Sequence, residues 1–175
     1  MASVKRKPVL IAVAVAVVVV GGGGYWAATV LLKPSASTDY LNKIAIGGYQ
    51  QISATDGGHG SSTAPSTGIY LGPAVSNDAL LKAIDGPDLV LKSTDLAAYG
   101  ITPQPGSQFN QVALEYSAAN ACGVEVGTLQ PGTAPDATWN LTAQQIKQVQ
   151  GGTSMIFDLQ VTCGVTIGVG GVGVS

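Results

Sequence analysis

The sequence contains an uncharged run of twenty-five residues, from Pro8 to Leu32, directly after the basic cluster Lys5-Arg6-Lys7. An α-helix needs about 20 apolar residues to cross a hydrocarbon core ~30 Å thick, and basic residues that flank such a helix stay in the cytoplasm. We therefore predict a cytoplasmic N-terminus over residues 1–7 and a single transmembrane helix over residues 8–32. The chain from Lys33 onward should then lie on the periplasmic or extracellular side of the membrane.

The same run can also be interpreted as a signal peptide. Val9–Val20 would be a hydrophobic segment of twelve residues, which is within the usual length, and the small residues of Gly21–Gly24 or Ser35–Ser37 would suit a cleavage site. Apolar residues resume after the glycines, from Tyr25 to Leu32. This second apolar half favours an uncleaved anchor in the lipid bilayer.

Four consecutive glycines, Gly21, Gly22, Gly23 and Gly24, divide the apolar run. Glycine costs a soluble helix ~1 kcal/mol per residue relative to alanine, whereas small residues let transmembrane helices approach one another closely. The glycines therefore mark either a kink in a lipid-exposed helix or a contact face for a neighbouring transmembrane helix. Both interpretations stay open at the level of the sequence.

The part after Lys33 is acidic and has about 140 residues, enough for one domain. Four lysines and ten carboxylates give it a net charge of −6, and it contains no arginine. Nucleic-acid binding depends on clustered Lys and Arg side chains that neutralise phosphates. We therefore exclude nucleic acid as a partner.

The residues next to the membrane are predicted to form a linker and a helix over residues 33–53. Lys33–Ser37 has the composition of a linker, and Thr38-Asp39 can cap a helix. One helical face would carry apolar or small residues at positions 41, 44, 45, 48 and 52, although Gly47-Gly48 weakens the pattern. A β-rich domain over residues 54–175 is then expected, beginning with an irregular loop over residues 53–68.

Alternating apolar and polar residues predict antiparallel strands in this domain. The clearest alternation runs from Met155 to Val169, where every odd position is apolar and Gly164 offers a point for a bend. Residues 112–116 and 122–126 alternate in the same way, with Val112, Leu114 and Tyr116 on the buried face of the first. Shorter strands are predicted over residues 69–71 and 89–91.

Helix signals are fewer. Ser76 is expected to cap a helix over residues 77–84, and residues 94–99 are expected to form a helical turn. Thr142 and Gln145 are expected to form a capping box at the start of a helix that ends at Gly151. The glycine-rich tail over residues 170–175 is predicted to be an edge strand or a contact with another subunit. The fold class is thus one transmembrane helix followed by a β-rich extracytoplasmic domain, either an antiparallel sandwich or an α+β sheet.

Two cysteines, Cys122 and Cys163, lie on the apolar faces of predicted strands. An extracytoplasmic compartment oxidises thiols, so we predict a Cys122–Cys163 disulfide. The spacing is unlike that of a redox CxxC motif, which indicates a structural bond.

No residues are assigned to catalysis, to a cofactor or to a metal. The sole histidine, His59, lies in a glycine-rich stretch that cannot position a catalytic base, and a zinc site needs three or four ligands. Asp85-Gly-Pro-Asp88 is interpreted as a turn. Glu115 and Glu125 are placed on the solvent faces of adjacent strands, where paired carboxylates can hydrolyse glycosides but more often serve solubility.

The sequence therefore favours a non-catalytic, membrane-anchored structural or accessory subunit of a larger assembly. Its domain would pack on integral membrane or assembly partner proteins, in a bilayer complex, a surface filament or a membrane-containing virion. The alternative is a tethered periplasmic or extracellular binding or adhesion module. That module would expose an aromatic patch formed by Tyr70, Tyr99, Tyr116 and Trp139.

Overall fold

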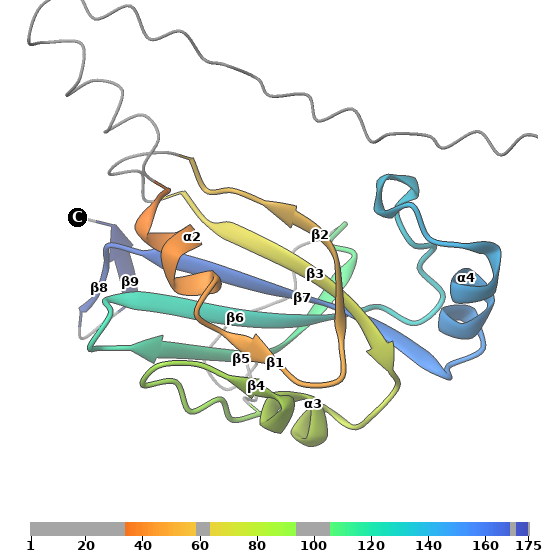
Figure 1. Cartoon of the computed structure of the whole chain (residues 1–175). Helices are drawn as coiled ribbons and strands as arrows, with labels where there is room; N and C mark the ends of the chain where they lie inside the picture. The colour runs from red at the N-terminus through yellow and green to blue at the C-terminus, as the bar shows by residue number, and fades with distance from the viewer. Residues whose placement is uncertain (1–33, 59–63, 94–105, 169–170, 175) are drawn as a thin grey trace, which may run out of the picture.

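The computed structural model describes residues 34–58, 64–93, 106–168 and 171–174 (Figure 1). The elements in chain order are α2 (Ala36–Leu41), β1 (Ala45–Ile46), β2 (Gln50–Thr55), β3 (Ser66–Pro73), α3 (Asn77–Ala83), β4 (Ile84–Asp85), β5 (Phe109–Ser117), β6 (Cys122–Leu129), the 3-10 helix η2 (Ala137–Trp139), α4 (Ala143–Gln150), β7 (Ser154–Cys163), β8 (Val165–Gly168) and β9 (Gly171–Val174).

Five of the strands form one fully antiparallel sheet in the order β2-β3-β7-β6-β5. β7 lies at its centre, because this ten-residue strand has the longest alternation of apolar and polar residues in the domain. Phe157, Leu159 and Val161 point to one face and are fully buried, whereas Asp158 and Gln160 belong to the other face. The β-rich antiparallel prediction is confirmed, and five of the strands belong to one main sheet.

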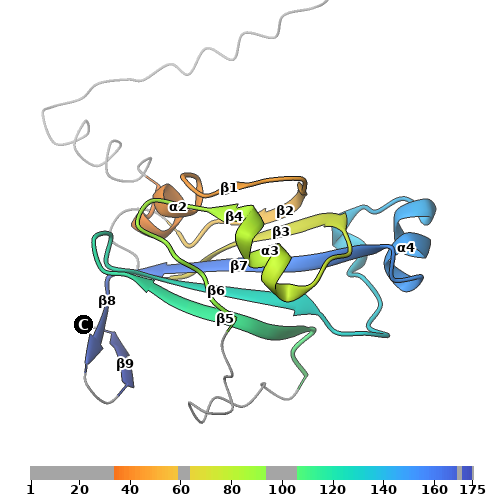
Figure 2. The same cartoon turned by 90° about the horizontal axis from the view of Figure 1, so that it is seen from below.

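One face of the sheet is covered by α2, α3 and the short β1–β4 pair, which form a second layer (Figure 2). This layer and the sheet enclose the main hydrophobic core, in which Phe157 contacts Tyr70 and Tyr49. Leu80 of α3 and Val124 of β6 are completely buried here. Burial of a large aliphatic or aromatic side chain contributes about 1.5–3 kcal/mol, so this layer supplies most of the hydrophobic stabilisation.

The opposite face carries a smaller hydrophobic cluster at one end of the sheet. Trp139 of η2 packs there with Ile156, Leu71 and Ile69, and Phe109 lies 6.1 Å from Trp139 between ring centroids. α4 closes this end (Figure 2), and Val149 packs on the cluster. The predicted capping box of Thr142 and Gln145 that begins α4 is confirmed.

The helix predicted after Thr38, within residues 33–53, is wrong beyond Leu41. α2 ends at Leu41, and the chain continues as β1 and β2. Gly48 adopts φ +81°, a left-handed conformation that ends regular structure and suits glycine. Residue 53 lies inside β2, so the predicted boundary at 53/54 divides a strand of the sheet. The predicted loop over residues 53–68 is strand at both its ends, over residues 53–55 and 66–68, and residues 59–63 lie outside the described structure.

Three strand predictions also need correction. β7 stops at Cys163, because Gly164 (φ +75°) turns the chain into β8, which pairs with β9 instead of the main sheet. Residues 89–91 form no strand. β5 contains a bulge between Gln111 and Ala113, so Val112 and Ala113 are both buried and Leu114 belongs to the opposite face. The predicted helix from Ser76 and the strand over 69–71 are confirmed.

Within the described residues, no helix has the length and apolarity needed to cross a membrane. The predicted transmembrane helix over residues 8–32, the basic cluster Lys5-Arg6-Lys7, the glycines Gly21–Gly24 and the predicted turn over 94–99 all lie outside those residues.

Candidate functional site

The disulfide joins β6 and β7 at one end of the sheet. Cys122 and Cys163 are directly opposite in the strand register, with their Cα atoms 4.0 Å apart, and they are bonded to each other. Both are nearly fully buried. The predicted disulfide is confirmed, and it links the central strand β7 to its neighbour β6.

The start of the domain is anchored beside this bond. The backbone N–H of Cys163 donates to Oγ of Ser37 at 3.0 Å, and the N–H of Ser35 donates to the carbonyl of Gly58 at 3.2 Å. Ser35 and Ser37 have no exposed surface. The predicted linker over residues 33–37 is therefore part of the folded domain from Pro34 onward.

Thr38 completes this hydrogen-bonded group. Its hydroxyl donates to the carboxylate of Asp56 and lies 2.8 Å from Oγ of the fully buried Ser66, which accepts from the N–H of Gly57 at 2.9 Å. We call Ser35, Ser37, Thr38, Asp56 and Ser66 the entry cluster. Sequence reasoning missed it, because a Ser- and Thr-rich stretch has no hydrophobic periodicity and resembles a linker.

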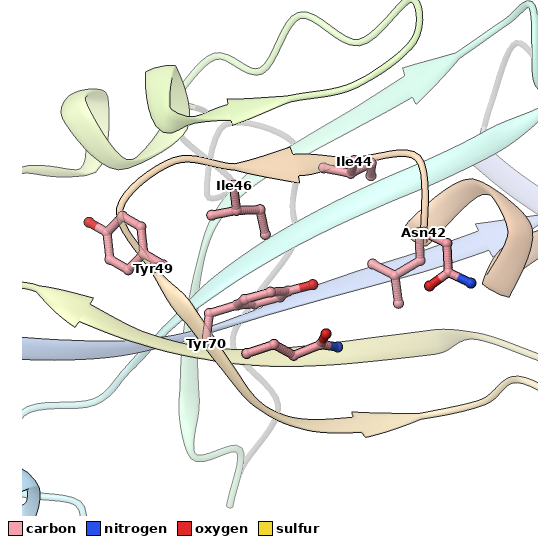
Figure 3. Close-up of a pocket in the computed structure, with 7 residues that line it drawn as sticks. Asn42, Ile44, Ile46, Tyr49 and Tyr70 are labelled. Carbon is pink, nitrogen blue, oxygen red and sulfur yellow. The ribbon is translucent and has the colours of Figure 1, made fainter.

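A shallow cavity of about 200 Å³ lies between α2, β1, β2 and β3 (Figure 3). Seven residues line it: Leu41, Asn42, Ile44, Ile46, Tyr49, Gln51 and Tyr70. Ile46 is directed towards the ring of Tyr70, which lies along the floor (Figure 3). Drug-sized ligand sites occupy about 300–1,000 Å³, so this cavity suits a group of only a few heavy atoms.

The floor of the cavity is built from packed aromatic rings. The ring of Tyr70 stacks on Phe157 at 5.2 Å between centroids, with an interplanar angle of 18°, and Phe157 is fully buried. Tyr49 packs edge-on against the ring of Phe157, and its hydroxyl donates a hydrogen bond to the carbonyl of Pro73 at 3.2 Å. Burial raises the pKa of Tyr70 and of Tyr49, so both hydroxyls stay protonated at neutral pH and the cavity presents uncharged polar groups.

Two carboxyl groups lie close together on the other face of the sheet. Asp158 of β7 is opposite Gly127, and Glu125 is two residues along β6. Oδ1 of Asp158 is buried and makes no hydrogen bond within the described structure. Desolvation and, second, the charge of Glu125 raise the pKa of Asp158 to about 7, although backbone N–H groups of Asp158 and Gly127 oppose the shift. Burial also raises the pKa of Glu125.

This pair differs from the one that the sequence indicated. The register pairs Glu115 with Val124 and Glu125 with Leu114, so the two glutamates lie on opposite faces of the sheet and cannot act on one substrate. The alternation along β7 placed Asp158 on the polar face but gave no sign of its burial. The single sequence signal for the burial of Asp158 was the small residue Gly127 on a neighbouring strand.

The predicted aromatic patch is not assembled. Tyr70 belongs to the main core and Trp139 to the cluster on the opposite face. Tyr99 and His59 lie outside the described residues. Among the residues that the structure describes, no three His, Cys, Asp or Glu side chains come close enough to hold a metal ion, Asp85 and Asp88 included.

No family model, curated protein or solved structure matches this chain.

Proposed function

We propose that the chain is a non-catalytic, single-pass membrane subunit of a larger assembly. Residues 8–32 anchor it, Lys5-Arg6-Lys7 keep its N-terminus in the cytoplasm, and the β-rich domain packs on partner proteins on the other side. Gly21–Gly24 provide a place where a partner transmembrane helix can approach closely.

The observation that carries this proposal is that the hydrogen-bonded entry cluster begins at Ser35, with two residues between it and the predicted anchor. The predicted anchor ends at Leu32, and Ser35 is already fully buried and hydrogen-bonded. A flexible linker would let a domain reach over many ångströms, whereas here two residues separate the predicted helix from the entry cluster. Such an attachment holds the domain near the bilayer in a restricted orientation, as contact with integral neighbours requires.

The disulfide supports an extracytoplasmic location. Disulfides persist in oxidising compartments and are rare in the cytosol, and the Cys122–Cys163 bond is buried within the sheet. This agrees with the orientation that the basic cluster before residue 8 predicts.

The proposal is tested by lengthening the attachment. A flexible Gly-Ser spacer of ten residues is inserted between Lys33 and Pro34 in the tagged full-length chain, which is then purified in detergent from its native membranes. We expect integral partners to co-purify in fixed stoichiometry with the unchanged chain and to be lost from the spacer variant.

The matched control carries the same spacer in the exposed turn at Gly132, away from the entry cluster. This variant should retain its partners, because the height and orientation of the domain are unchanged. A monodisperse monomer from the unchanged chain, or equal recovery of partners with both spacers, would contradict a subunit held beside its neighbours.

The cavity at Tyr70 favours a second candidate, a tethered binding module for a small uncharged polar group. Gln51 and Asn42 offer amide donors and acceptors, and none of the seven lining side chains is charged at neutral pH. A Gln51→Leu variant would lose binding of such a group while keeping its partners. Loss of partners in this variant would instead indicate that the cavity belongs to the assembly contact.

A further inference from the structure

β2 lies at the border of the five-stranded sheet and has one unpaired edge (Figure 1). β3 pairs with its inner edge, and no strand in the described part of the chain pairs with its outer edge. An edge strand presents a row of backbone N–H and C=O groups to its surroundings. The outer edge of β2 therefore has the hydrogen-bonding groups that a further strand would match.

The register of the sheet shows which groups point outward. The N–H of Ala74 donates to the carbonyl of Thr153 at 3.2 Å and continues the ladder between β3 and β7. Hydrogen-bonded and non-hydrogen-bonded pairs alternate along an antiparallel ladder, so the even-numbered residues of β3, with Gly68 among them, bond to β7. Gly68 is opposite Ala54 of β2. The N–H and C=O of Ala54 therefore point away from β3, to the free side of β2.

β2 also lacks two features that keep edge strands from pairing. Natural proteins protect such edges with charged side chains, with proline or with a covering element. β5, the strand at the opposite border of the sheet, carries Glu115 on the same face as the buried Val124. In contrast, the sequence contains no charged residue and no proline from Ile44 to Thr55.

The pairing edge is short. A bulge interrupts β2 just before Ser53, so the regular part of the strand is Ser53–Thr55. Asp56 follows, and its carboxylate accepts hydrogen bonds from the hydroxyl of Thr38 and the N–H of Gly58, which hold it to its own domain. A contact of this length is weak by itself and suits a partner that the same membrane already holds at high effective concentration.

We propose that an extended, uncharged segment of a partner protein adds a strand to the outer edge of β2. Backbone hydrogen bonds supply the affinity in this kind of recognition, so the edge needs no charged or aromatic anchor. The inference deepens the proposed function and rests on it, since it names the surface through which a neighbouring subunit contacts the domain.

A second copy of this chain matches the edge less well. Two β2 strands that pair antiparallel place their C-terminal ends at opposite ends of the pair. The start of the domain lies at that end of β2, because the N–H of Ser35 donates to the carbonyl of Gly58. Two predicted anchors would then leave the paired sheet at opposite ends, and two acidic domains would repel each other. A strand from an uncharged segment of another protein meets neither obstacle.

The test uses the tagged full-length chain, purified in detergent from its native membranes. Ala54→Pro removes the outward N–H and places a ring at the free edge, while the hydrogen bonds to β3 stay intact. Ala54→Ser is the matched control, because it keeps the N–H at the same exposed position. We expect the recovery of partners to fall about tenfold with Ala54→Pro, through the loss of a backbone hydrogen bond, and to stay unchanged with Ala54→Ser.

Amide hydrogen exchange of the unchanged chain is a second measurement, which does not depend on how the proline variant folds. The N–H of Ala54 should exchange about tenfold or more slowly in the purified assembly than in the chain separated from its partners by a stronger detergent. Equal exchange in the two samples would overturn the inference. If the urea midpoint of Ala54→Pro falls, this measurement decides.

The outcomes separate this inference from the proposed function. If a folded Ala54→Pro variant keeps its partners and the spacer before Pro34 releases them, pairing at β2 is wrong and the anchored subunit stands. If the unchanged chain carries no partners, both are wrong. An assembly that contains several copies of this chain and no other protein also overturns the inference, because a second copy would then occupy the edge.

Discussion

Oδ1 of Asp158 lies directly over the Cα of Gly127 on the neighbouring strand, in the space that a side chain at position 127 would occupy. A Cβ there would also meet Cβ of Phe109 at 3.0 Å. Gly127 is thus required by the packing of its neighbours rather than by its own backbone conformation.

Gly127→Ala should therefore destabilise the domain by about 1–3 kcal/mol, the usual range for overpacking a core. Urea unfolding measures the loss. Gly47→Ala is the matched control, because a Cβ there meets only the carbonyl oxygen of Ala83 at 3.8 Å, and it should change the free energy of unfolding little. Combining Gly127→Ala with Asp158→Ala should recover part of the loss, and no recovery would contradict the assigned clash.

The stability of the domain should fall as the pH rises from about 4 to 7. The pKa of Asp158 is raised to about 7 from an ordinary value of 3.8, so over this interval the folded state holds a proton that the unfolded state has lost. Stability then decreases by up to about 1.4 kcal/mol per pH unit, and this slope ends above the folded pKa. Urea unfolding at pH 5, 6, 7 and 8 measures the slope.

Asp158→Asn should flatten this dependence and stabilise the domain at pH 8, since the amide carries no charge to desolvate. Glu125→Gln should move the slope to lower pH, because the charge of Glu125 contributes to the raised pKa. Asp136→Asn is the control. Hydrogen bonds from Thr138 lower the pKa of Asp136, so the titration of Asp136 changes the stability of the domain only below pH 4. A flat profile in the unchanged protein would contradict burial of an uncompensated carboxyl.

The central strands could be predicted from sequence because their alternation coincides with burial. Val124 of β6 and Leu159 and Val161 of β7 face a completely buried core. Apolar and polar residues therefore alternate along these strands with almost no exceptions. β5 was harder, because its bulge at Val112 shifts the alternation by one residue. A bulge depends on the partner strand and leaves no periodic signal in the strand itself.

The entry cluster and the Asp158 pair could not be predicted for a different reason. Ser35 and Ser37 are buried through hydrogen bonds, and polar residues in an irregular segment normally indicate exposure. Between residues 38 and 52 the few apolar positions, such as Ile44 and Ile52, match a helical face and two short strands equally well. The burial of Asp158 follows from what lies across the sheet, which requires the register.

Ser37→Ala should cost the domain about 1–3 kcal/mol, because it leaves the backbone N–H of Cys163 buried beside a methyl group that cannot accept a hydrogen bond. Urea unfolding provides the value. Ser93→Ala, at an exposed position, should stay within about 0.5 kcal/mol of the unchanged protein. Equal effects of the two substitutions would show that the entry of the chain is not fixed to β7.

Reduction of the disulfide should destabilise the domain by about 2–5 kcal/mol, the range found for native disulfides in small extracellular domains. The bond joins positions 41 residues apart, and closing that loop restricts the unfolded chain. The melting temperature with and without reductant measures the effect. In a Cys122→Ala/Cys163→Ala variant, reductant should cause no further change, and the variant should melt with the reduced protein. If reductant lowered the melting temperature of that variant as well, the loss could not be assigned to the Cys122–Cys163 bond.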